Sequence, residues 1–125
     1  MVQPNIIQFL YFLFFFIKNK INYYSSYIVN IFNTFKTIPD FVLIDGRFRV
    51  LTTLKIILFL IKKQCTKNII IIIDDYLDRE HYQIVGGIIN VNLIGRFGVI
   101  KYNTKTKINI KKLNMAIKKF FYDFR

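Results

Sequence analysis

The sequence predicts an α/β domain in which a short parallel sheet of about three strands is flanked by helices and preceded by an apolar helical segment. Residues 69–73 are five consecutive isoleucines, the profile of a strand covered on both faces, as parallel sheets require. Residues 41–45 form a second short apolar run that ends in Asp45, and the largely apolar segment 49–63 between the two runs has the length of a helix. Because crossovers of this kind are right-handed and join neighbouring strands, we expect the two strands to be parallel.

The N-terminal part, residues 1–37, is predicted to be a hydrophobic helical segment. Residues 6–17, "IIQFLYFLFFFI", are apolar apart from one glutamine. As a helix they would span about 18 Å, less than the roughly 30 Å of a bilayer core. No positive charge precedes this run and no small-residue cleavage site follows it, which argues against a secretion signal. A buried core helix and an interfacial or short membrane anchor both remain open. Residues 21–36 show apolar residues near helical spacing, and Pro39 ends this second helix.

Residues 38–125 carry the predicted α/β pattern. The helix over 49–63 closes on two lysines, which suit the negative end of a helix dipole. After the isoleucine strand we expect a helix over about 79–91, loosened by Gly86-Gly87, and a strand over 96–102. The last predicted helix is amphipathic. Its apolar face would hold Ile110, Leu113, Ile117, Phe120 and Phe124, and its wet side Lys111, Lys112, Lys118 and Lys119.

Composition limits the function classes. The 125-residue chain has a net charge of +12 and is 54% hydrophobic, and the dominance of Ile, Lys, Asn, Phe and Tyr suggests an AT-rich genome. A basic chain can contact nucleic acid or an anionic membrane, but no zinc-finger spacing or RNA-binding signature is present, so we do not predict a nucleic-acid partner. Cys65, in a loop after a helix, is the only cysteine, which excludes an intrachain disulfide and fits a reducing, cytoplasmic location. Membrane association through residues 6–17 is the alternative.

Carboxylates follow both predicted strands. If the strands are parallel neighbours, Asp45, Asp74 and Asp75 converge at one edge of the sheet, where open α/β sheets bind ligands. Three clustered carboxylates could hold a hard cation such as Mg²⁺, or one of them could act as a base. In the competing interpretation, Asp45 or Asp75 only caps a helix.

Three further side chains are candidates. Arg47 and Arg49 could bind a substrate anion through their guanidinium groups, or could form salt bridges with Asp45 or Asp74. His81 is the only histidine and is a candidate general base, with a surface or capping role as the alternative. Ser25 and Ser26 have no matching base, so no hydrolase triad is predicted.

Three motifs carry a resemblance to a known family. "PDFVLIDGRFRV", "IIIIIDDYLDREHYQIV" and "GRFGVIK", in that order, resemble the C-terminal half of class I S-adenosylmethionine-dependent methyltransferase-like proteins, which have a Rossmann-like fold. More distantly, "IDG" and "IDDY" are similar to the macrocin O-methyltransferase group, in which an Asp-Gly aspartate and a later Asp-Asp pair hold a divalent metal. The resemblance covers about residues 38–102. It implies Mg²⁺ at Asp45, Asp74 and Asp75, and S-adenosylmethionine as the methyl donor.

The sequence departs from that family in two places. No Gly-x-Gly-x-x-Gly loop and no strand to carry it occur in residues 1–37, so the residues themselves identify no cofactor site. Arg47-Phe48 stands where the macrocin group has an acidic residue. We therefore expect a methyltransferase-like half-domain that is not catalytic alone, with a truncated or metal-assisted O-methyltransferase fragment and a small basic membrane-associated protein as alternatives. A sheet cut in this way leaves an apolar edge, which the N-terminal segment, a partner chain or a homo-oligomer would cover.

Overall fold

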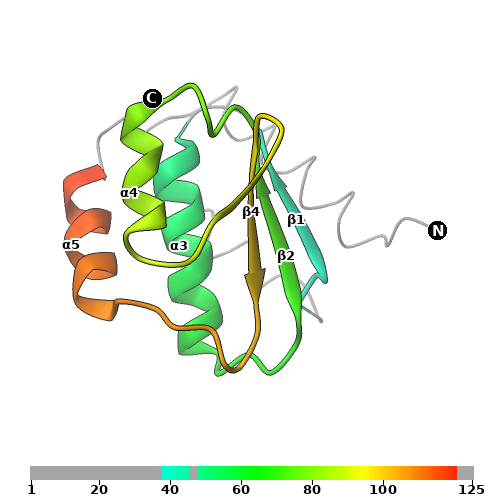
Figure 1. Ribbon diagram of the computed structural model, residues 1–125. Helices are drawn as coiled ribbons and strands as arrows, with labels where there is room; N and C mark the ends of the chain where they lie inside the picture. Colours follow the sequence, from blue (N-terminus) through cyan, green and yellow to red (C-terminus); the bar gives the residue numbers. More distant parts are fainter. Residues whose placement is uncertain (1–37, 46–47, 121–125) are drawn as a thin grey trace, which may run out of the picture.

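The computed structural model describes residues 38–45 and 48–120 (Figure 1). The predictions for residues 6–17 and 21–36, the boundary at residue 37, and the predictions for Arg47 and Phe124 lie outside these ranges. In chain order the elements are β1 (Phe41–Ile44), α3 (Arg49–Lys62), β2 (Ile69–Ile73), the 3₁₀-helix η2 (Glu80–Tyr82), α4 (Gln83–Gly86), β3 (Asn92–Ile94), β4 (Phe97–Tyr102) and α5 (Ile110–Phe120).

The four strands form one mixed sheet in the order β1-β2-β4-β3. β1 and β2 are parallel, with Phe41 opposite Ile70, as the sequence predicts. β4 is antiparallel to β2 and to β3, so the sheet formed by the described residues has four strands of mixed direction in place of about three parallel ones. The difference arises because β3 and β4 form a hairpin that turns at Gly95, whose φ of 59° is readily adopted by glycine. The α/β class is confirmed, but β4 runs in the opposite direction to the parallel strand that the sequence predicts.

The described helices lie on one side of the sheet, with α3 next to the strands and α5 packed against α3 (Figure 1). Side chains that face the helices are fully buried, among them Val42, Ile71 and Ile100. Alternate residues point to the other face, where Ile70 is 40% exposed. The isoleucine run was predicted to be buried on both faces. Ile70 shows that its second face is only partly covered.

The segment after β2 differs most from its prediction. The helix expected over 79–91 is instead a turn of 3₁₀-helix followed by the short α4, which ends at Gly86. The chain then continues as Ile88 and Ile89, both buried, and Ile89 forms a bridge with Ile108. β3 was not predicted because its three residues are all exposed and carry no alternation of apolar and polar side chains.

α5 is amphipathic as predicted. Leu113, Ile117 and Phe120 are buried, while Ile110, at the first residue of the helix, is 45% exposed and does not join the apolar face. The four lysines predicted for the wet side are exposed. Cys65 follows α3 in a loop, as predicted, and is buried against the core. None of the helices within the two described ranges has the length and apolar character needed to cross a membrane.

Candidate functional site

The carboxyl ends of β1 and β2 bring three aspartates together. Asp45 directly follows β1, and Asp74 and Asp75 directly follow β2. The backbone N–H of Asp74 donates to the carbonyl of Ile44 at 3.0 Å, which continues the parallel ladder past the strand ends and holds the two termini side by side. The predicted convergence at one edge of the sheet is therefore observed.

Arg49, the first residue of α3, lies between these carboxylates. Its Nη1 donates to the backbone carbonyl of Asp74 at 2.7 Å, and its Nη2 donates to Oδ1 of Asp45 at 3.1 Å. Nη1 also lies 3.5 Å from Oδ2 of Asp75. The Arg49 side chain is only 10% exposed, and its positive charge lies within ion-pair distance of both Asp45 and Asp75. The salt bridge to Asp45 is one of the two roles that the sequence left open for Arg49.

Arg96 binds the cluster from the other side. Its Nε lies 2.9 Å from Oδ1 of Asp74, and its Nη2 donates to Oδ2 of the same carboxylate at 3.3 Å. The Arg96 side chain is 60% exposed, whereas that of Asp74 is 11% exposed. Sequence reasoning missed Arg96 because a parallel strand over 96–102 would place it at the far end of the sheet. The antiparallel direction of β4 places it beside the end of β2.

The backbone next to the cluster adopts unusual conformations. Phe48 has a φ of 59° and Asp75 a φ of 54°, both in the left-handed region that residues other than glycine rarely enter. Such conformations cost free energy and concentrate at functional sites. The Phe48 side chain is buried, and Oδ1 of Asp74 accepts a hydrogen bond from the N–H of Asp75 at 2.9 Å, so the surrounding contacts hold both residues in place.

Tyr76, the residue after Asp75, is buried. Its N–H donates to the carbonyl of Arg96 at 2.9 Å, and its ring covers Gly98 so closely that a Cβ there would lie 2.6 Å from Cγ of the ring. Burial raises the pKa of the Tyr76 hydroxyl above its usual value of 10.0, and a hydrogen bond with the Gly86 backbone acts in the opposite direction. Tyr76 therefore stays neutral at physiological pH and acts as a packing residue.

The chemistry of the cluster follows from its charges. Three carboxylates and two guanidinium groups leave a single negative charge, and each carboxylate already has a cationic partner. Within the described ranges, no group of three His, Cys, Asp or Glu side chains is arranged to hold a metal ion. The Mg²⁺ site at Asp45, Asp74 and Asp75 thus stays a prediction from the resemblance. The arrangement as described is that of a structural ion-pair network.

The predicted general base lies on η2. The ring of His81 packs edge-on against that of Tyr82, with the ring centres 4.4 Å apart. Tyr82 is itself almost completely buried. His81 thus contacts the hydrophobic core through its neighbour, and its role as a base stays a prediction.

Comparison with known proteins gave no match, whether to a protein-family model, to a curated protein or to a solved structure.

Proposed function

We propose that this chain is a methyltransferase-like half-domain that does not catalyse methyl transfer alone and that extends its sheet by pairing with a second copy of itself. The proposal combines the resemblance in residues 38–102 with the absence of a glycine-rich donor loop from the sequence. The ion pairs at the strand ends support it, because the carboxylates that would act in catalysis are engaged by Arg49 and Arg96.

The proposed pairing between two copies of the chain rests on the edge-strand character of β1. β1 is the terminal strand of the described sheet, and its sequence, FVLI, contains none of the lysine, proline or charged residues that usually protect an edge. β3, at the opposite end, has only three residues, which limits any pairing there. An edge strand of this kind favours addition of another strand, and a symmetric dimer would pair β1 with β1.

The hydrogen bonds of β1 show which residues would pair. The carbonyls of Asp40 and Ile44 accept hydrogen bonds from β2 and the residue after it, at 3.0 Å each. In a parallel ladder the residues that bond to one neighbour alternate with those that point away. Phe41 and Leu43 therefore direct their backbone groups to the outer edge.

This alternation makes a proline substitution selective. Leu43→Pro removes an outward N–H and leaves the bonds to β2 in place, which edge strands tolerate. We expect the full chain to sediment as a dimer and Leu43→Pro to sediment as a monomer. Leu43→Ala is the matched control for the lost side chain and should remain dimeric. A monomeric parent chain, or a dimer that survives Leu43→Pro, would contradict the pairing.

Calorimetry tests the rest of the proposal. Titration of S-adenosylmethionine into the full chain should give no heat of binding, with or without Mg²⁺. A micromolar dissociation constant would overturn the non-catalytic assignment. If that binding also required Mg²⁺ and was lost in Asp74→Ala, the metal-assisted transferase would replace it.

A further inference from the structure

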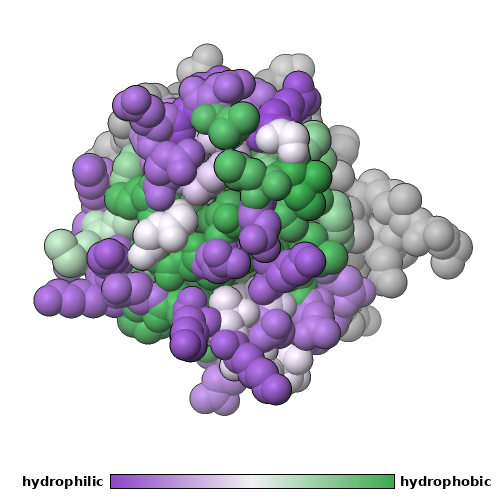
Figure 2. All heavy atoms as spheres, in the orientation of Figure 1, coloured by the Kyte–Doolittle hydropathy of each residue, from purple (hydrophilic) through white to green (hydrophobic). Residues whose placement is uncertain are grey.

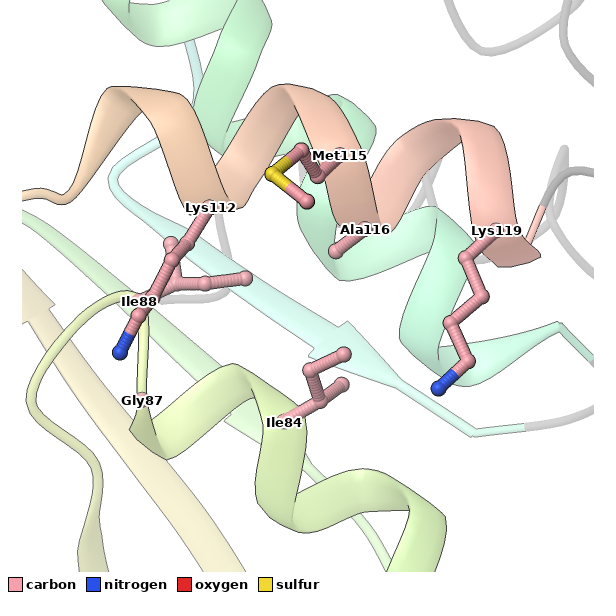
Figure 3. Close-up of a pocket in the computed structure, with 7 residues that line it drawn as sticks. All are labelled: Ile84, Gly87, Ile88, Lys112, Met115, Ala116 and Lys119. Atoms are coloured by element: carbon pink, nitrogen blue, oxygen red, sulfur yellow. The ribbon is translucent and has the colours of Figure 1, made fainter.

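A hollow of about 420 Å³ lies between α5 and the segment formed by α4 and the two residues after it (Figure 3). Its size falls within the range of small-molecule pockets, roughly 300–1,000 Å³. The lining residues are Ile84, Gly87, Ile88, Lys112, Met115, Ala116 and Lys119. The surface on this side of the molecule mixes apolar and hydrophilic side chains, with apolar ones exposed at its centre (Figure 2).

The wall of the hollow is almost entirely apolar. Ile88 and Ala116 form its buried part. Ile84 and Ile88 line the α4 side, and Ala116 lies on α5 across from Ile84 (Figure 3). Met115 is 63% exposed at the rim, where its unbranched side chain can adjust to a ligand. Gly87 also lines the hollow and contributes no side chain to it. An apolar ligand chain would be removed from water here.

Two lysines stand on either side of this apolar surface. Lys112 and Lys119 extend from α5 toward the α4 side (Figure 3). Their backbone positions on α5 are two helical turns apart, or about 10 Å along the helix axis. All ion pairs found within residues 38–45 and 48–120 involve other residues. Lys119 also lies against the ring of Phe120, at 5.5 Å. A ligand that fills the hollow would therefore meet positive charge at both ends.

We propose that the hollow binds a single-chain amphipathic anion, a carboxylate of the medium-chain fatty acid class. Its hydrocarbon chain would lie against Ile84, Ile88 and Ala116, and its carboxylate would pair with Lys112 or Lys119. An apolar wall with cations at its ends favours a ligand that is both apolar and anionic. A compact hollow suits a flexible chain better than the extended helix of a partner protein. This site is independent of the function proposed for the strand ends.

The first test compares ligands. Octanoate, decanoate and dodecanoate are titrated into the full chain by calorimetry, each below the concentration at which it self-associates. Each added methylene should tighten binding by up to about fourfold until the hollow is full. Decylamine, with the same chain and the opposite charge, should bind at least tenfold more weakly than decanoate. Equal affinity for the two, or no dependence on chain length, would overturn the proposal.

The second test fills the hollow. Gly87 lines the hollow, and a Cβ there would meet only the carbonyl oxygen of Ile84, at an ordinary 3.5 Å, so Gly87→Leu is expected to reduce the space for a ligand. Decanoate binding should fall at least tenfold, while the thermal unfolding midpoint should change little. Unchanged affinity in a variant that folds normally would contradict the site.

The third test separates local from general charge. Lys112→Glu with Lys119→Glu should weaken decanoate binding at least tenfold. Lys111→Glu with Lys118→Glu makes the same change in net charge on the same helix, at positions that do not line the hollow, and should leave binding within about twofold. Equal losses in both pairs would indicate non-specific attraction. Flotation with anionic phospholipid vesicles distinguishes a lipid surface, since vesicle binding without decanoate binding would refute the proposal.

Discussion

The strand-end cluster and the α4–α5 hollow use charge in opposite ways. In the cluster, Arg49 and Arg96 are hydrogen-bonded to carboxylates and to a backbone carbonyl, so each carboxylate has a cationic partner within the cluster. In the hollow, Lys112 and Lys119 flank apolar side chains and share no described ion pair. The cluster contains residue types that are common in catalytic sites, but these residues are paired with one another, as in a structural ion-pair network. The hollow has ordinary residue types and the unsatisfied charge of a binding site.

The types of residue at a site therefore do not decide whether their charges are available to a ligand. A carboxylate paired with a buried guanidinium group is not available to bind another cation. An ammonium group in solvent beside an apolar surface is still available to bind an anion. Substitutions should therefore act on stability at the cluster and on ligand binding at the hollow.

Replacing Arg49 should have the largest effect. Arg49→Met retains much of the side-chain stem but removes the donors to the Asp74 carbonyl and to Asp45, at 2.7 and 3.1 Å. We expect the free energy of unfolding to fall by about 3 kcal/mol, because these acceptors lose a buried, charged partner. Urea denaturation measures the change through its midpoint and slope.

Arg96→Met is the matched control for that experiment. Arg96 binds Asp74 with good geometry, but its side chain is 60% exposed, so solvent weakens the interaction. We expect a loss of about 1 kcal/mol or less. If the two variants lost equal stability, burial would not be what distinguishes the two arginines, and the view of Arg49 as the structural centre of the cluster would be wrong.

The contrast between Arg49 and Arg96 also shows how far the sequence predicts this region. The apolar runs at 41–45 and 69–73 and the helix at 49–63 specify a strand–helix–strand unit, so the meeting of Asp45 with Asp74 and Asp75 could be predicted. Arg96 could not, because the direction of β4 depends on the β3–β4 hairpin. β3 is short and exposed, and the Gly95 turn alone does not reveal it. The hollow was beyond sequence reasoning for a related reason: it depends on α4 ending at Gly86.

Gly98 near the cluster and Gly87 at the hollow differ in the space available for a side chain. Gly98, opposite Ile73 at the end of β2, has no room for a methyl group, since a Cβ would lie 2.6 Å from Cγ and 2.8 Å from Cδ2 of Tyr76. Gly98→Ala should cost about 2 kcal/mol of unfolding free energy through overpacking. Gly87, at the hollow, has a φ of −78°, and a Cβ there would make only an ordinary contact of 3.5 Å with the carbonyl oxygen of Ile84. Gly87→Ala should instead stabilise by about 0.4–1 kcal/mol, because alanine restricts the unfolded chain.

Thermal and urea unfolding of the two alanine variants measure both changes in unfolding free energy, the loss expected for Gly98→Ala and the gain expected for Gly87→Ala. A double variant in which Tyr76→Ala accompanies Gly98→Ala should cost less than the sum of the single changes, since the clash is then absent. If the two losses were additive, the destabilisation by Gly98→Ala would not be caused by a clash with Tyr76. A destabilised Gly87→Ala would show that the α4–α5 region is as tightly packed as the cluster.

The smallest effect on stability is expected at the lysines of the hollow. Lys112→Gln and Lys119→Gln remove charges that take part in none of the described ion pairs, so the free energy of unfolding should stay within about 0.5 kcal/mol of the parent value. Glutamine keeps the polarity of these positions, so a change in decanoate affinity would report the lost charge. A loss of stability as large as that of Arg49→Met would mean that these lysines hold the fold together. A stable protein with weakened binding would mean that their charge serves a ligand, which is the distinction between the two regions.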